Sequence, residues 1–438
     1  MKQLLIFSVP FIFANLLQQL YNLADMVIVG QFVGSAGLAA ASGGGELGML
    51  FLFGAIGFAS GGQIVIAQHI GAGSREQVGK TVGTMFTFLF FMGVAFTIIA
   101  LSCCDWLINL LNMPEEALGY AHDYSFVYFC GIIPVFGYNS VSSILRGMGD
   151  SKHPFIFIAI AAVLNVILDL LLVGPLKMGC FGAALATVVS QTISFIIALI
   201  FLYRHREEFG FDFRLKSFRI DKKELRSIAK MGAPLAVMNM AVSVSMLFIA
   251  RYINAYGVVA SAATAVGNKI TMVATICTSA MMAAGNTVIG QNFAARKYDR
   301  VKVIVGCILI ICLAFTGLLA AILALFPEQV FSLFDRDPEV LELSHTYVLS
   351  GVIALVGFAT RGTSFAFCNG IGNSRLSFIG GMIDGIVARI GLSLFFGVYL
   401  DMGIQGFWLG SAIAGNVIGL FCVFYFFFAN WQEQKLLV

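Results

Sequence analysis

Twelve apolar stretches of roughly 20 residues dominate this chain and limit what it can fold into. They fall at roughly 5–30, 47–70, 82–104, 122–145, 154–174, 180–203, 230–253, 269–292, 303–326, 343–368, 377–399 and 404–429. The chain is 59% hydrophobic and 11% charged, whereas soluble domains carry about 25% charged residues. Lipid-exposed backbone must satisfy its own hydrogen bonds, so each stretch is expected to be a helix. We predict an all-α integral membrane protein with twelve transmembrane helices.

Basic residues are unevenly distributed between the short polar turns. Most of the 26 Lys and Arg residues lie in segments on the same side as the N-terminus, and many of them fall in the hydrophilic segment 204–229. The turns on the opposite side keep Lys177 and Arg336 and carry mainly acids. Cytoplasmic loops of membrane proteins are enriched in Lys and Arg. We therefore expect a multi-pass protein of the cell (inner) membrane with both termini and segment 204–229 in the cytoplasm.

The two halves of the chain repeat each other at an offset of 223 or 224 residues. The segment Gly147–Lys152 matches Gly370–Arg375, and Pro10 matches Pro234. We predict an N-terminal lobe (1–203), a cytoplasmic connector (204–229) and a C-terminal lobe (230–438). Six helices in each lobe give both the same orientation, so a pseudo-two-fold axis along the membrane normal is expected to relate them. Substrate sites in such transporters lie between the repeats, which favours alternating access.

Several motifs resemble those of the multidrug and toxic compound extrusion (MATE) transporters. They lie on the first span, directly after the fourth span, and on the fifth and sixth spans, at Tyr21–Asp25, Arg146–Asp150, Asn165–Asp169 and Gly182–Thr187. The resemblance covers essentially the whole chain, including the six-plus-six arrangement of spans. It implies efflux of organic cations or other amphiphiles, driven by inward flow of sodium ions or protons.

Two carboxylates, Asp25 and Asp169, fall at membrane depth in the first half, with no Lys or Arg at that depth to neutralise them. Such residues are costly in a bilayer and are functional candidates by default. Asn165 lies four residues before Asp169 and shares its helix face, and Thr187 lies on the next span. These oxygens suit Na⁺ or a proton. The resemblance implies a cation site at Asp25, Asn165, Asp169 and Thr187 with Tyr21 beside it, and the alternative is a helix-packing network.

The second half carries different charges at membrane depth: Asp384, Arg361 and Arg389. The repeat mates of Asp25 and Asp169 there are apolar, near Ile249 and Leu392. Some MATE transporters place cation-binding acids on the seventh and tenth spans, and this chain has none, which argues against a second sodium site. We interpret Asp384 with an arginine as a structural pair that neutralises itself.

Substrate contacts are expected from residues that stack on flat cations or adapt to them. The candidates for this cleft are Gln18, Tyr21, Met26, Tyr138 and Met238. Glu46 and Lys269 are repeat mates at the expected outer ends of the second and eighth spans. They form a hypothetical extracellular gate, for which two unrelated interfacial charges are the alternative.

The combined prediction is a secondary active antiporter rather than an enzyme. It exports organic cations or amphiphilic drugs in exchange for inward H⁺ or Na⁺, by alternating access with the cation site in the N-terminal lobe. It needs no cofactor, no metal other than Na⁺ at the cation site and no nucleic acid, and we expect a monomer in the bilayer. Two alternatives remain open. A lipid-linked oligosaccharide flippase would need a strongly cationic cavity, which the N-terminal spans do not offer. An intramembrane aspartyl enzyme would use Asp25 and Asp169 as its catalytic pair. The substrate and the choice of coupling ion stay open.

Overall fold

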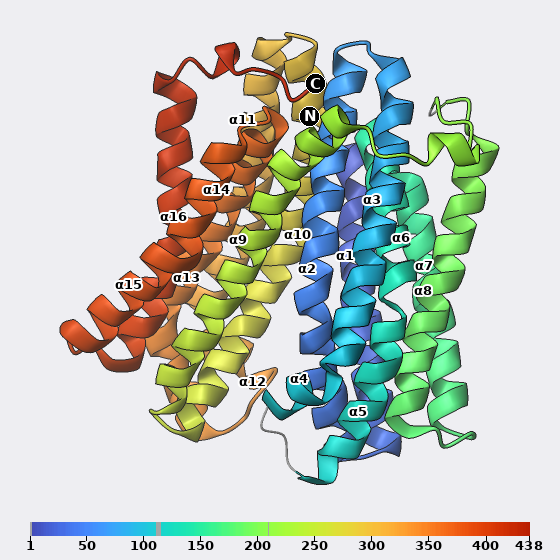
Figure 1. The fold of residues 1–438 in the computed structure, drawn as a ribbon. Coiled ribbons are helices and arrows are strands. Elements are labelled where there is room, and N and C mark those ends of the chain that lie inside the picture. Colours follow the sequence, from blue (N-terminus) through green and yellow to red (C-terminus); the bar gives the residue numbers. More distant parts are fainter. Residues whose placement is uncertain (1, 111–114, 209) are drawn as a thin grey trace. The chain divides into compact units, whose positions relative to one another are not determined.

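The structure is a computed structural model that describes residues 2–110, 115–208 and 210–438. These residues form helices and short connections, with no strand among them (Figure 1). The predicted all-α class is confirmed. Helices satisfy every interior backbone group within the segment, which a bilayer requires.

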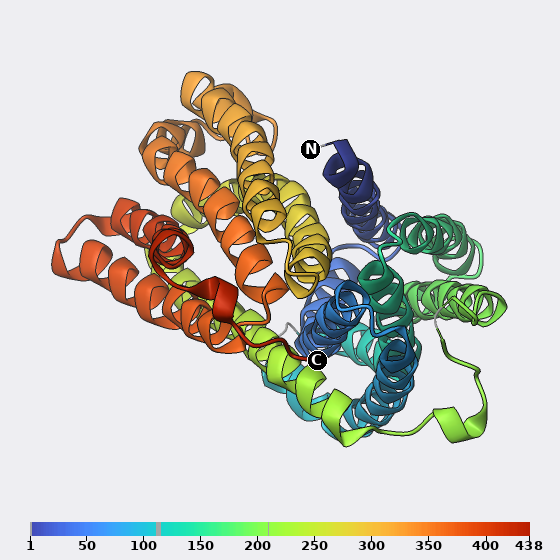
Figure 2. The ribbon, with the colours of Figure 1, turned by 90° about the horizontal axis from the view of Figure 1, so that it is seen from above.

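The chain divides into two compact units. One unit, which we call the N-terminal unit, comprises Val9–Ala236. The other, the C-terminal unit, comprises Val237–Leu437 together with the first turns of α1. The division at 236–237 falls inside the long helix α9 (Lys222–Asn254). In Figure 2 most of the helices are seen along or near their axes, from above.

The helices of the N-terminal unit follow the chain in simple succession. They are α1 (Lys2–Phe32), α2 (Ser35–Gly71), α3 (Arg75–Ser102), α4 (Cys104–Leu110), α5 (Glu115–Cys130), α6 (Ile132–Met148), α7 (Lys152–Val173), α8 (Gly179–Arg204) and the short η1 (Leu215–Ser217). Helices α7 and α8 pack along each other, and α2 packs against α5 and α6.

The C-terminal unit continues from α9 with a similar order of long helices. They are α10 (Val258–Ala294), α11 (Tyr298–Leu325), α12 (Pro327–Ser332), α13 (Pro338–Gly370), α14 (Ser374–Met382), η2 (Ile383–Ala388), α15 (Arg389–Leu394), η3 (Phe395–Tyr399), α16 (Gly403–Phe428) and η4 (Trp431–Glu433). The segments from α14 to η3 form one continuous span, Ser374–Tyr399. Helix α13 packs against α10, α11 and α16 and is central to this unit.

Eleven helices among the described residues are long and apolar enough to cross a membrane, and the bent pair α5–α6 makes twelve. The pair bends by 47° at Gly131. Pro134 lies just beyond the bend and has no N–H to bond to the preceding turn. The repeat mate of Pro134 is Gly357, and the corresponding helix α13 is unbroken.

The sequence repeat recurs as a repeat of contacts inside each unit. A Cβ atom at Gly44 would lie 2.6 Å from the ring of Tyr124, and one at Gly267 would lie 2.4 Å from the ring of Tyr347. Each pair is offset from the other by 223 residues. Positive φ angles recur in the same way, at 90° for Gly34 and 100° for its mate. The repeat is therefore one of helix packing as well as of sequence.

Helices α2 and α10 begin well before the apolar stretches predicted at 47 and 269. The added turns are rich in Gly and Ala, which carry little hydropathy but allow close helix contact. Glu46 and Lys269 consequently lie about three turns inside their helices rather than at the helix ends. Both side chains are exposed.

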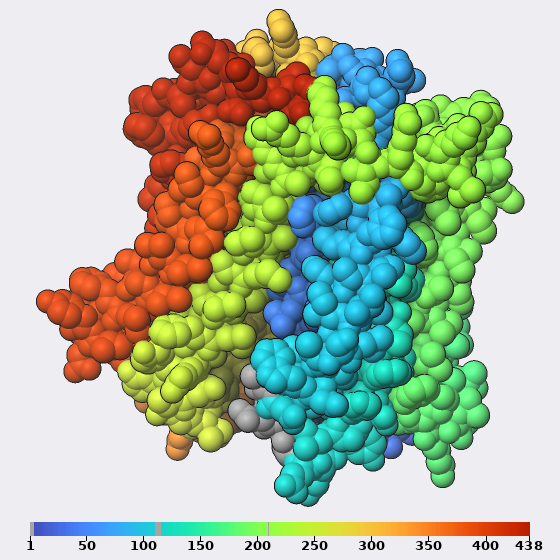
Figure 3. All heavy atoms as spheres, viewed as in Figure 1, coloured from blue at the N-terminus to red at the C-terminus, as the bar shows by residue number. Residues whose placement is uncertain are grey.

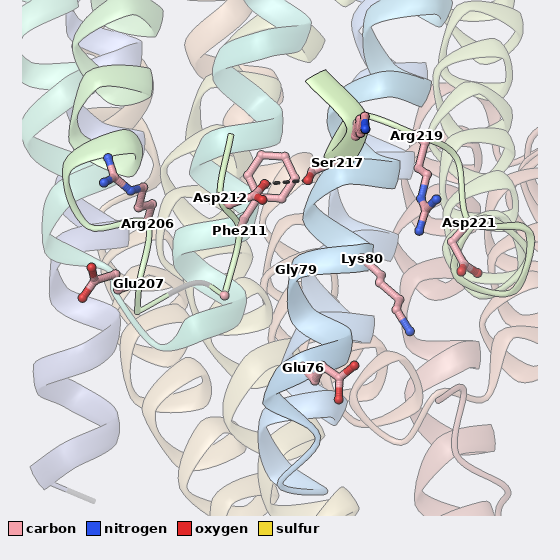
Figure 4. A pocket seen from close by; sticks show the side chains of 12 residues that line it. Glu76, Gly79, Lys80, Arg206, Glu207, Phe211, Asp212, Ser217, Arg219 and Asp221 are labelled. Carbon is pink, nitrogen blue, oxygen red and sulfur yellow. Dashed lines mark hydrogen bonds between the residues drawn. The ribbon is translucent and has the colours of Figure 1, made fainter. Parts of the chain in front are cut away.

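The polar connector between α8 and α9 crosses the first turns of α3 (Figure 3). Its backbone approaches so closely that a Cβ at Gly79 would meet the Gly210 carbonyl oxygen at 2.1 Å. Connector and helix enclose a mixed-charge pocket of about 370 Å³ (Figure 4). In the connector, Ser217 donates a hydrogen bond to Asp212 and holds the pKa of that carboxyl below its usual value.

Candidate cation site

Three helices of the N-terminal unit carry the predicted cation-site residues. Asp25 lies on α1, Asn165 and Asp169 lie one turn apart on α7, and Thr187 lies on α8. Asn165 and Asp169 are almost wholly buried, and Asp25 is 9% exposed. The Asn165 Nδ2 atom donates a hydrogen bond of 3.3 Å to the Thr187 hydroxyl. The amide nitrogen is thereby held on α8, which leaves the Asn165 carbonyl oxygen free to act as an acceptor.

Buried oxygens in this cluster lack donors. Asp25 Oδ1, Asn165 Oδ1 and both carboxylate oxygens of Asp169 have no hydrogen-bond partner among the described residues. Neither carboxylate forms an ion pair within that part of the chain, and the two lie close enough to interact electrostatically. Burying unpaired carboxylates is costly. A cation or a proton would remove that cost, because it supplies the missing positive partner.

Tyrosines line the same region of the unit. Tyr21 and Tyr124 are buried and lie near the Asp25 carboxylate. Gln18 hydrogen-bonds the Tyr21 hydroxyl from one turn away, so these two side chains share a polar face of α1. Tyr124 also lies near Asp169 and stacks on Tyr128. Sequence reasoning did not assign Tyr124 to this site. Its recurrence as Tyr347 in the repeat was the available signal.

The other proposed cleft residues occupy varied environments. Tyr138 is buried on α6, and its hydroxyl donates a 3.1 Å hydrogen bond to the Pro154 carbonyl oxygen. Met238 is buried on α9 against Gly381 of the same unit. Met26 is 38% exposed on α1. A role in substrate binding stays a prediction for all three.

The charged residues of the C-terminal unit form a three-membered cluster. Asp384 is fully buried and lies between two arginines, 2.9 Å from Arg361 Nε and 2.9 Å from Arg389 Nη2. Arg389 also donates to the Ser411 hydroxyl at 2.9 Å. Asp384 and Arg389 are joined through the π-helix η2, whose wider turn suits their five-residue separation. The cluster carries one positive charge in excess. The interpretation that it neutralises itself is therefore incomplete.

Glu46 and Lys269 lie in different units, on α2 and α10 respectively. The gate that they were expected to form stays a prediction.

A further polar cluster of the N-terminal unit was missed by sequence reasoning. Glu224, in the first turn of α9, is 2% exposed. Its carboxylate accepts a 2.8 Å hydrogen bond from the Thr81 hydroxyl and lies 3.1 Å from His69 Nε2. These residues come from three helices. In sequence, Glu224 is one of many charges in a hydrophilic stretch, so no local pattern distinguishes it.

Comparison with known proteins decides the family. The MatE family model matches residues 10–171 and 234–395, which is one match in each half of the chain. The chain belongs to the MATE family. It is therefore a multi-pass membrane transporter of small molecules and not an enzyme, which excludes the intramembrane aspartyl enzyme considered above.

Individual relatives of this MATE transporter span nearly all of it. The probable multidrug resistance protein YoeA of Bacillus subtilis is 26% identical over 99% of this chain and 95% of its own length. A protein named FAD transporter from Shewanella oneidensis is 26% identical over 92% of this chain and 89% of its own length. The crystal structure of MATE in complex with MaD3S is 25% identical, with a TM-score of 0.89 over 97% of this chain and 94% of that one.

A MOP superfamily transporter from Pyrococcus furiosus has the same fold, with a TM-score of 0.90 at 24% identity over 97% of this chain and 94% of that one. The predicted fold with two helical lobes is confirmed by these structures. Drug extrusion is the activity named for several relatives.

Proposed function

We propose that this MATE transporter is a secondary active exporter of organic cations or amphiphilic drugs, coupled to inward H⁺ or Na⁺ at the N-terminal cation site. The observation that carries the proposal is the set of buried oxygens without donors on Asp25, Asn165 and Asp169. A membrane protein that leaves two neighbouring carboxylates unpaired gains stability when a cation binds them. That gain is available to drive a conformational change.

The membrane potential supplies about 2.3 kcal/mol for each positive charge that enters down 100 mV. Occupancy of the site would favour one orientation of the transporter, and release to the cytoplasm would favour the other. Gln18, Tyr21, Met26, Tyr138 and Met238 are the proposed substrate contacts, and Glu46 with Lys269 is the proposed outer gate. The functional unit is a monomer with both termini in the cytoplasm. One relative, from Shewanella oneidensis, is named an FAD transporter.

The test is export of a fluorescent cation, ethidium, from proteoliposomes with Na⁺ and pH gradients imposed separately. Asp169→Asn keeps the shape of the side chain and removes its charge. We expect cation-driven export to fall more than tenfold, because the substituted site no longer attracts a cation. The unfolding temperature should hold or rise, since an unpaired buried charge has been removed.

Asp25→Asn should behave in the same way. Asp299→Asn is the matched control, since the Asp299 side chain is fully exposed at the start of α11, and it should leave export unchanged. Undiminished gradient-driven export by Asp169→Asn would contradict the assignment of the cation site.

A further inference from the structure

A cavity of about 130 Å³ lies inside the C-terminal unit beside the arginine cluster. Its polar lining includes Arg361, Arg389 and Ser350, and its apolar lining includes Phe358 and Trp408. A single enclosed water needs about 10–15 Å³, so this space is large enough for a small headgroup with part of an apolar body. The lining is polar at one place and aromatic around it, as ligand sites commonly are.

The charge that faces this cavity is positive. Arg361 and Arg389 line it, whereas Asp384 does not and is fully buried behind them. One carboxylate offsets one of the two guanidinium groups. The remaining positive charge is held in surroundings of low polarity, where an unpaired charge is costly.

Two buried side-chain donors of residues that line this cavity have no hydrogen-bond partner among the described residues. Arg361 contacts Asp384 through Nε at 2.9 Å, and its side chain is 20% exposed. The Nε atom of Arg389, whose side chain is only 6% exposed, is buried without a partner there. The hydroxyl of Ser350, a residue 2% exposed, is likewise unpaired. Buried donors are normally satisfied, and Arg presents several donors in a planar fork that matches an oxyanion.

We propose that this cavity binds the oxyanion of an organic monoanion, a carboxylate or phosphate ester on an apolar body. The oxyanion accepts hydrogen bonds from Arg361, Arg389 and Ser350, and the apolar body packs against Phe358 and Trp408. Asp384 positions both guanidinium groups and sets the ligand charge at minus one. As a binding site it is independent of the cation site. As a substrate contact it rests on the export function proposed above.

The position of Trp408 permits a direct binding assay. The chain has three tryptophans, and of these Trp408 lines the cavity. The probe is 11-bromoundecanoate, because bromine quenches indole fluorescence only at short range. The purified full-length protein in uncharged detergent should show saturable quenching by this acid. The uncharged 11-bromoundecanol should quench at least tenfold less effectively, and Trp408→Phe should remove the saturable part.

Arg361→Gln tests the charge, since it leaves the Asp384–Arg389 pair intact and brings the cluster to neutrality. The affinity for the acid should fall at least tenfold, while the response to the alcohol should stay the same. Arg361→Lys keeps the charge and should recover part of the affinity. Arg251→Gln is the matched control, because Arg251 is exposed on α9 and does not line the cavity. Equal affinity of Arg361→Gln and the parent protein for the acid would overturn the proposal.

A second arm separates the two sources of such a ligand. Nanodiscs that contain bromine-labelled phosphatidic acid present the oxyanion on a lipid, whereas the free acid presents it on a dissolved solute. Quenching of Trp408 in either arm supports the site and names its source, and quenching in neither overturns it. If ethidium export proves independent of Asp169 while acid binding still depends on Arg361, the export proposal fails and this site stands.

Discussion

At the scale of single residues, the buried carboxylates of the N-terminal unit differ in whether they have a hydrogen-bond donor. Asp169 is buried without a donor, whereas Glu224 accepts a hydrogen bond from Thr81 and lies beside His69. The oxygens of an ion-binding site must be free to accept the ion, whereas the oxygens of a structural carboxylate are hydrogen-bonded within the protein. Glu224 therefore fits a structural role in fastening the start of α9 to α2 and α3.

Replacing Glu224 by Ala should destabilise the folded protein by about 2–3 kcal/mol, since hydrogen bonds to a charged group are worth about 1.5–3 kcal/mol each and His69 loses its partner. Thermal unfolding in detergent measures this as a lower midpoint. Glu224→Gln should lose less, because its amide oxygen still accepts from Thr81. Glu207→Ala, at an exposed position in the connector, should change stability by less than about 0.5 kcal/mol. An Ala variant as stable as this control would refute the structural role of Glu224.

At the scale of helices, glycines set how closely the elements approach. Gly267 of α10 lies against the Tyr347 ring of α13, and a Cβ there would come within 2.4 Å of the ring. Gly267→Val should therefore cost about 1–3 kcal/mol through overpacking. Unfolding in mild detergent measures the loss, and Tyr347→Leu in the same chain should restore part of it. Purely additive effects of the two substitutions would show that the contact is not responsible.

Gly306 on α11 is the matched control for that helix substitution. Nothing lies within 4 Å of a Cβ placed at Gly306, so Gly306→Ala adds a side chain without a clash. It should be neutral or stabilise the helix by up to about 1 kcal/mol, since Ala is the better helix former. The contrast between the two glycines separates packing from helix propensity.

At the scale of the whole molecule, the distribution of basic residues predicts which loops face the cytoplasm. Lys177 and Lys435 are both exposed and are predicted to lie on opposite sides of the membrane. In intact cells, a membrane-impermeant maleimide should label Lys177→Cys and leave Lys435→Cys unlabelled until the cells are opened. Exposed Cys130 is first replaced by Ser to lower the background. Labelling of Lys435→Cys in intact cells would reverse the predicted topology.

The sequence alone was enough to predict the class of fold, the spans and the internal repeat. These depend on features that act locally, because about twenty apolar residues span a bilayer wherever they occur. It also identified Asp25 and Asp169, since a charge at membrane depth is conspicuous in an apolar stretch. The starts of α2 and α10 were predicted too late, because Gly and Ala carry little hydropathy.

Tertiary structure alone decided which of these side chains meet and what they lack. Four-residue spacing places Asn165 beside Asp169 on one helix, but Asp25 comes from another helix, α1, and only the tertiary structure brings its carboxylate close enough to interact with Asp169. The same holds for Glu224 with His69, and for Arg361, which reaches Asp384 from another helix. Helical periodicity determines the face on which a residue lies. Contacts between faces depend on how distant helices pack, and that information is spread over the whole chain.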